Sequence, residues 1–228
     1  MFAAIYKQAP AAMLCLLLAF PAFAAEKPLT IVALGDSLTA GYLLGPDDGF
    51  APQLEKALRA RGHHNIVIVN GGVSGDTSSG GLSRLDWTVG PEADAVIVEL
   101  GANDALRGID PKLTRRNLEE ILKRLSGRHL PVLLAGMIAP PNMGAEYGKT
   151  FNAIYPKLAA ENHLVFYPFF LDGVAGELNG KPVAADLTLA DGMHPNTAGV
   201  AIIVARILPK VETLIAEAQK AREKRAQK

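Results

Sequence analysis

Residues 29–42 read LTIVALGDSLTAGY, and this stretch decides the fold. Its first six residues, 29–34, are apolar or β-branched, and they are followed at once by Gly35 and a polar turn. A short apolar run without regular polar alternation is typical of a strand that is covered on both faces of a parallel sheet. We therefore expect a buried strand at 29–34 whose carboxyl end leads into a loop containing Asp36 and Ser37.

The rest of the chain alternates similar short runs with longer segments of helical period. Further strands are expected at 66–70, 95–100, 131–137 and 164–167, and helices at 53–60, 111–127, 150–162 and 198–218. Asp110 and Pro111 form the N-cap and first turn of the best-marked helix, which Gly127 ends. Pro209 is expected to kink or restart the last helix, because proline has no backbone N–H. This alternation predicts an α/β fold with a parallel sheet between two layers of helices.

The composition fits one globular domain. The chain has 228 residues and is 49% hydrophobic and 20% charged, which suffices for a substantial core. We place the domain at 26–218 and a charged tail at 219–228, expected to be a frayed, solvated helix end rather than an attachment to an acidic surface. Lys plus Arg and Asp plus Glu both number 23, so no global positive field favours nucleic acid.

Residues 1–24 have the features of a secretory signal peptide. Lys7 precedes an apolar run at 11–20, and Ala22-Phe23-Ala24 supplies a small-residue cleavage pattern. An uncleaved anchor is the alternative, but about ten apolar residues fall short of the roughly twenty that cross a bilayer. We expect an exported protein, periplasmic or secreted, without stable membrane insertion after cleavage. The only cysteine is Cys15, so the mature chain would offer neither a disulfide nor a thiol nucleophile.

Polar turns follow the first three expected strands. They are Gly35-Asp36-Ser37-Leu38, a glycine-rich segment that reaches Gly75, and Gly101-Ala102-Asn103-Asp104. Ligands of open α/β sheets bind beyond the carboxyl ends of the strands, so these three turns can meet in space. The second turn lacks the Gly-Lys-Ser/Thr ending of a phosphate-binding loop, which disfavours a nucleotide site.

A fourth pattern, Asp191-Gly192-Met193-His194-Pro195, precedes the last expected helix. Its spacing lets Asp191 hold one ring nitrogen of His194 while the other nitrogen acts as a base. A serine hydroxyl needs such a base because it is a weak nucleophile by itself. We therefore expect a catalytic triad of Ser37, His194 and Asp191. Neutral donors for the oxyanion are the backbone amides of Ser37 and Gly75 and the side-chain amide of Asn103.

These four segments resemble the sequence blocks of the SGNH, or GDSL, hydrolase family, which is named for its Ser, Gly, Asn and His residues. The matching positions are Ser37, Gly75, Asn103 and His194, and the resemblance extends over essentially the whole mature chain. It implies the same triad with Asp191, and the same oxyanion hole. It also implies a three-layer, flavodoxin-like fold with a five-stranded parallel sheet in the order 2-1-3-4-5. The implied activity is hydrolysis of carboxylic esters and thioesters without a cofactor, as in arylesterases, lysophospholipases and thioesterases.

Other interpretations stay open at this level. Asp191 and His194 are acceptable metal ligands, but no third ligand is evident, and we expect no metal. A carbohydrate O-deacetylase, or a non-catalytic module that binds a lipid or a glycan, is compatible with the same fold. The expected partner is a small acyl ester or a lysophospholipid, and the sequence indicates no oligomeric state.

Two further sets of residues have expected roles. Asp36 and Asp104 adjoin glycine-rich turns, so we expect them to hold these loops by hydrogen bonds to backbone amides rather than to react. Met137, Ile138 and Met143 suit the wall of an acyl pocket, although they can equally pack against the core.

Overall fold

The computed structural model describes residues 27–175, 177–178, 181–182 and 185–227. Its centre is a five-stranded parallel sheet in the order β2-β1-β3-β4-β5. The strands are β1 (Leu29–Gly35), β2 (Ile66–Gly72), β3 (Ala95–Glu99), β4 (Val132–Ala135) and β5 (Val165–Tyr167). All five expected strands are present, and the expected order 2-1-3-4-5 is confirmed. The expected signal peptide at 1–24 lies outside the described residues.

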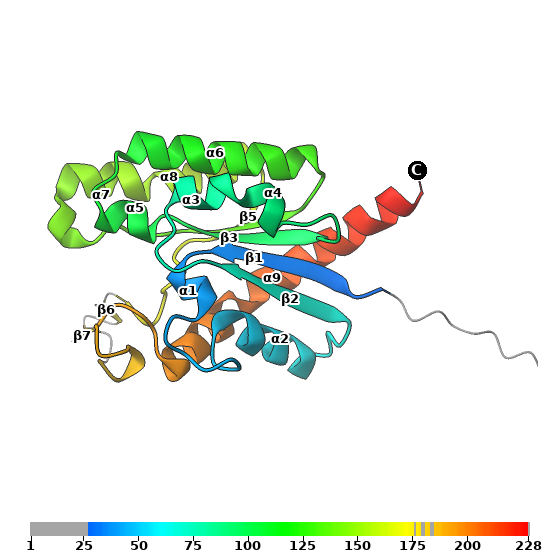
Figure 1. Ribbon diagram of the computed structural model, residues 1–228, viewed down its shortest axis with the longest axis horizontal. Coiled ribbons are helices and arrows are strands. Elements are labelled where there is room, and N and C mark those ends of the chain that lie inside the picture. The colour runs from blue at the N-terminus through cyan, green and yellow to red at the C-terminus, as the bar shows by residue number, and fades with distance from the viewer. Residues whose placement is uncertain (1–26, 176, 179–180, 183–184, 228) are drawn as a thin grey trace, which may run out of the picture.

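Helices cover both faces of the sheet, with α1, α2 and α9 on one side and α3 to α8 on the other (Figure 1). The helices are α1 (Ser37–Ala40), α2 (Phe50–Ala60), α3 (Ser78–Ser83), α4 (Leu85–Thr88), α5 (Ala102–Leu106), α6 (Pro111–Gly127), α7 (Ala145–Asn152), α8 (Ile154–Glu161) and α9 (Thr197–Ala226). Short elements are η1 (Pro141–Met143), β6 (Glu177–Leu178), β7 (Lys181–Pro182) and η2 (Ala185–Leu187). This arrangement confirms the three-layer α/β fold. No helix within the described residues combines the length and apolar character needed to cross a bilayer.

Strand β1 is buried because it lies between two neighbouring strands and two helical layers. Ile31, Val32 and Leu34 are fully buried. The strand pairs in parallel with β2 and with β3, so that Ile31 lies opposite Ile68 on one side and Ala95 on the other. The apolar run at 29–34 is therefore the centre of the core, and its carboxyl end emerges in the middle of the sheet edge.

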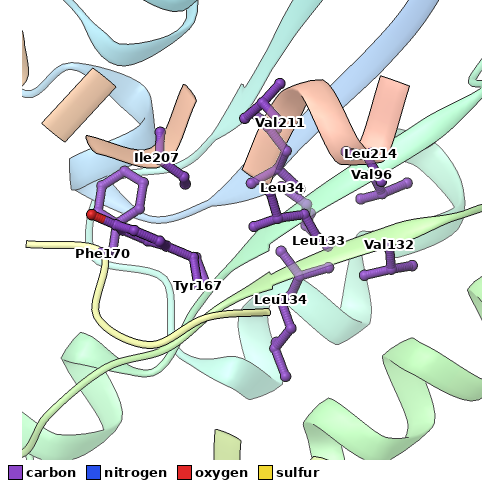
Figure 2. Close-up of a cluster of buried hydrophobic side chains, with 14 of the residues drawn as sticks. Leu34, Val96, Val132, Leu133, Leu134, Tyr167, Phe170, Ile207, Val211 and Leu214 are labelled. Carbon is purple, nitrogen blue, oxygen red and sulfur yellow. The ribbon is translucent and has the colours of Figure 1, made fainter. Parts of the chain in front are cut away.

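Helix α9 contributes a large part of the core. Figure 2 shows Ile207, Val211 and Leu214 of this helix within the buried cluster that includes Leu34 of β1. Of the expected kink or restart at Pro209, the restart is absent, because α9 continues through the proline as one helix. Burial of side chains on both sides of the proline stabilises the helix and offsets the missing hydrogen bond.

The segment expected to form one helix at 150–162 is instead two helices, α7 and α8, separated at Ala153. Pro156 lies in the first turn of α8 and has no N–H to donate to the carbonyl of Asn152, four residues earlier. A proline is well tolerated in a first turn, where this N–H would have no helical partner. The chain therefore begins a new helix just before Pro156.

The tail is more ordered than the sequence indicated. Helix α9 extends to Ala226, and Arg222 donates hydrogen bonds to the carbonyls of Lys27 (2.7 Å) and Pro28 (2.7 Å). Arg222 and Arg225 also form ion pairs with Asp94, whose side chain is 8% exposed. The expectation of a frayed, solvated end is wrong for these two arginines, because the buried carboxylate of Asp94 needs partners.

Arg222→Ala is expected to lower the free energy of unfolding by about 1–3 kcal/mol at neutral pH, because Asp94 would stay buried without its main donor. Burial opposes ionisation of Asp94, but the hydrogen bond and charge of Arg222, with the Thr30 amide and the charge of Arg225, hold its pKa below the ordinary value. A lowered carboxylate pKa stabilises the fold above its unfolded pKa, and this stabilisation is lost as the pH falls through the folded pKa. The effect of the variant should therefore shrink in acid.

Urea unfolding at several pH values measures this difference. Lys224→Ala on the same helix is the matched control, since Lys224 is exposed. Equal stability of the two variants at neutral pH would contradict a structural role for the Arg222–Asp94 pair.

Candidate active site

The turn after β1 places Ser37 at the carboxyl edge of the sheet. Strand β1 ends at Gly35 and α1 begins at Ser37, with Asp36 as the N-cap that accepts a hydrogen bond from the Leu38 amide at 3.0 Å. A Cβ atom on Gly35 would lie 2.0 Å from Thr39 Oγ1 and 2.6 Å from Glu99 Oε2. Only glycine fits this close approach, which makes the sharp turn possible.

His194 joins Ser37 to Asp191. Its Nε2 atom lies 2.9 Å from Ser37 Oγ, and its Nδ1 atom lies 2.7 Å from Asp191 Oδ2. Hydrogen bonds from the backbone amides of His194 and Met193, followed by the bond from the His194 ring, lower the pKa of Asp191 to about 2. An ionised Asp191 can only accept a hydrogen bond, so Nδ1 of His194 must donate it and carries the proton of the neutral ring. The other ring nitrogen, Nε2, can then accept a hydrogen bond from the Ser37 hydroxyl.

The loop that carries His194 is held on both sides. The Leu189 amide donates to the His194 carbonyl at 2.8 Å, and Asn196 caps α9 by accepting from the amides of Ala198 and Gly199 at 3.0 Å each. Tyr42, which follows α1, packs its ring against the imidazole with the ring centres 4.6 Å apart. The sequence patterns gave no signal for this contact, because Tyr42 and His194 meet only in the folded chain.

The start of α5 brings Asn103 to the same edge. Its Nδ2 atom donates to Asp36 Oδ2 at 3.2 Å, directly beside Ser37 in the chain. Gly101 has φ +120°, and a Cβ atom there would lie 2.0 Å from the hydroxyl of Tyr155. That hydroxyl donates to the Leu100 carbonyl at 2.9 Å. The glycine therefore permits both the backbone conformation and the close packing that orient Asn103.

Gly75 lies in the loop after β2 with φ +86°. Its carbonyl accepts a hydrogen bond from Arg107 Nη2 at 2.8 Å, which ties this loop to the end of α5. Within the part of the chain that the structure describes, the amides of Ser37 and Gly75 have no hydrogen-bond acceptor. Both N–H groups are thus available to a ligand.

Buried polar residues hold the loops in place, as expected for Asp36 and Asp104. Asp104 is fully buried and accepts hydrogen bonds from the Ser78 amide at 2.7 Å and from Thr114 Oγ1 at 3.0 Å. Arg84 was not singled out from the sequence, yet it donates to the carbonyls of Gly35 (2.8 Å) and Gly71 (2.7 Å) and so ties the ends of β1 and β2 together.

Asp36 has an unusual environment for a residue next to a reactive serine. Burial raises its pKa to about 6, although hydrogen bonds from the Leu38 amide and Asn103 oppose this shift. Among the described residues, no three His, Cys, Asp or Glu side chains are arranged to hold a metal ion.

The model of the GDSL-like Lipase/Acylhydrolase family matches residues 33–202, which is most of the chain and includes Ser37, Gly75, Asn103, Asp191 and His194. The chain belongs to this family. Among other GDSL-like acylhydrolases, it is 35% identical to "Esterase TesA" of Pseudomonas aeruginosa over 187 residues, which is 82% of this chain and 89% of the relative.

One more relative and one solved structure match a similar share of this chain. It is 38% identical to "Thioesterase 1/protease 1/lysophospholipase L1" of Escherichia coli K12 over 181 residues, which is 79% of this chain and 80% of the relative. The crystal structure of AlinE4, titled an SGNH-hydrolase family esterase, superposes with a TM-score of 0.68 at 41% identity, covering 83% of this chain and 98% of AlinE4. The family and its fold expected from the sequence are therefore confirmed.

Proposed function

We propose that this protein is a serine esterase that hydrolyses carboxylic esters, and also thioesters, through an acyl-enzyme on Ser37. Membership of the GDSL-like acylhydrolases makes it a carboxylic ester hydrolase. The observation that supports the finer assignment is the continuous line of contacts from Ser37 Oγ through the His194 ring to Asp191, at 2.9 and 2.7 Å. These are the distances at which a base can take the proton of a nucleophile.

In the proposed reaction, His194 Nε2 takes the hydroxyl proton as Ser37 Oγ forms a bond to the ester carbonyl carbon. Asp191 stabilises the imidazolium that results. The carbonyl oxygen becomes an oxyanion, which the amides of Ser37 and Gly75 and the side chain of Asn103 would stabilise.

His194 then gives its proton to the leaving alcohol or thiol as the bond between this group and the carbonyl carbon breaks. Water attacks the acyl carbon while His194 takes one of its protons, and His194 then returns this proton to Ser37 Oγ as the bond between Oγ and the acyl carbon breaks and the carboxylic acid leaves. The same residues serve both halves of the reaction, so no cofactor is required.

Several large apolar side chains are exposed on the segments that follow the strands or adjoin His194. We define the apolar rim as the exposed apolar side chains on the loops and helix ends near the carboxyl edge of the sheet. Its members are Tyr42, Leu43, Val73, Leu106, Ile138 and Met193. Of the three residues expected at an acyl pocket, Met137 is buried in the core, Met143 is partly buried, and Ile138 is half exposed and belongs to the rim. An apolar surface beside the nucleophile favours a substrate with an apolar acyl chain over an acetylated sugar.

Hydrolysis of p-nitrophenyl esters by the purified protein tests the proposal, with Ser37→Ala as the control. A series of acyl lengths, a matched thioester and an acetylated sugar then compare the substrate classes. We expect kcat/KM to rise with acyl length, because each buried CH₂ contributes about 0.8 kcal/mol. Ester hydrolysis equal to that of Ser37→Ala would contradict the enzyme mechanism, and preference for the acetylated sugar would contradict the role of the apolar rim.

Export is also part of the proposed function. The protein recovered from the periplasm of the expressing cell should have its N-terminus at Ala25 or Glu26, as measured by intact mass, because signal peptidase cleaves after small residues such as Ala24 and Ala25. A chain that retains Met1 and the whole apolar run would contradict cleavage.

A further inference from the structure

Two carboxyl groups lie beneath the Ser37 turn, both fully buried. Asp36 accepts hydrogen bonds from the Leu38 amide and from Asn103. Glu99, the last residue of β3, accepts through Oε2 from Thr39 Oγ1 at 2.8 Å and from the Asp36 amide at 3.3 Å. The Glu99 carboxyl therefore contacts the backbone of Asp36, and the two carboxyl groups influence each other's pKa.

One oxygen of this pair lacks a donor. Glu99 Oε1 is the buried side-chain atom without a hydrogen-bond partner among the described residues. A fully buried carboxylate oxygen without a donor is costly, and two adjacent buried carboxylates cannot both ionise without strong repulsion. A proton on Oε1 removes both problems, because a carboxylic acid donates where a carboxylate can only accept.

The surroundings place this proton on Glu99 rather than on Asp36. Two N–H groups donate to Asp36, and the positive form of His194 would favour its ionised state, whereas no cation faces Glu99 among the described residues. The other titratable group nearby is Tyr155, whose hydroxyl is already used as a donor to the Leu100 carbonyl. Burial and the neighbouring Asp36 raise the pKa of Glu99 well above its ordinary value.

We propose that Glu99 is held as a neutral carboxylic acid that donates to Asp36, and that it acts as a positioning residue for Ser37 and Asn103. This inference rests on the proposed esterase function, since it assigns a role within that site. Glu99 does not touch the reacting atoms. It acts through the Asp36 amide and Thr39, which set the turn, and through the Asp36 carboxylate, which holds one N–H of Asn103 and leaves the other free for the oxyanion.

Infrared difference spectroscopy tests the protonation state without reference to activity. Wild-type protein at about pH 8, well above the ordinary carboxyl pKa, should show the C=O stretch of a buried carboxylic acid, and Glu99→Gln should lack it. Absence of this band from the wild-type protein, or its persistence in Glu99→Gln, would overturn the proposal. Failure of the esterase mechanism would leave this readout unaffected, so the two results are distinguishable.

The kinetics of two variants test the positioning role. Glu99→Gln keeps a neutral donor of similar shape and should retain kcat within a few-fold, whereas Glu99→Ala should lower kcat by about 10- to 100-fold with little change in KM, as expected when reacting groups are misplaced. Equal losses in the two variants would show that an ionised Glu99 is needed, and would overturn the proposal. If Glu99→Ala does not fold, the infrared result and the kcat of Glu99→Gln decide.

Discussion

Ser37→Ala is expected to lower kcat by on the order of 10⁶-fold, which is the size of the loss when a Ser–His–Asp triad loses its nucleophile. The variant removes the only oxygen that His194 Nε2 contacts at 2.9 Å among the described residues, so no acyl-enzyme can form there. Steady-state hydrolysis of a p-nitrophenyl ester measures the loss, and an intact-mass assay with a phosphonate inhibitor should show one adduct on the wild-type protein and none on the variant.

The same prediction extends to combinations of variants. His194→Ala and the double variant with Ser37→Ala should lose about as much activity as Ser37→Ala alone, because the residues of a triad act as a unit and their effects do not multiply. Ser74→Ala is the matched control, since Ser74 is an exposed hydroxyl in the neighbouring glycine-rich loop. Multiplicative losses, or a large loss in the Ser74 variant, would count against Ser37 as the nucleophile.

Asn103→Ala should lower kcat by about 100- to 1,000-fold, the effect of removing one donor from an oxyanion hole. The amide donates one N–H to Asp36 at 3.2 Å, which holds the other N–H at the edge where the oxyanion would form. Because the hydrogen bond from Asn103 to the oxyanion would strengthen as negative charge develops, the loss should fall on kcat and leave KM nearly unchanged.

A matched variant separates this effect from a loss of stability. Asn162 lies just after α8, and among the described residues its side-chain amide donates only to the Leu158 carbonyl, so Asn162→Ala should leave kcat unchanged. An unchanged kcat in Asn103→Ala, or a change confined to KM, would remove Asn103 from the proposed mechanism.

Local patterns predicted much of the fold. The apolar run at 29–34 is β1, Asp110 and Pro111 start α6 as expected, and the turns after β1, β2 and β3 come from the segments singled out in the sequence. The exceptions have local or tertiary causes. Pro156 divides one expected helix into two, whereas Pro209 does not interrupt α9 because packing against the sheet outweighs the lost hydrogen bond.

Other features of the site had no recognisable pattern in the sequence. Glu99 ends an apolar run, where a charged residue is ordinarily a solvated strand end, yet in the fold it is covered by the turn after β1. Tyr42 follows the Gly-Asp-Ser-Leu turn and Arg84 follows the glycine-rich segment, but their contacts with His194 and Gly35 become visible only in three dimensions.

The sequence by itself determined the order of the strands' apolar runs and the chemical groups available at Ser37, Gly75, Asn103, Asp191 and His194, because these depend on residue type and local spacing. The tertiary structure decided which groups meet and in what state. Ser37 and His194 are 157 residues apart in the chain but 2.9 Å apart in space, and the Asp36 amide and Glu99 meet across 63 residues. Protonation of a carboxyl group depends on its burial and its neighbours, and both of these arise only when distant segments pack together.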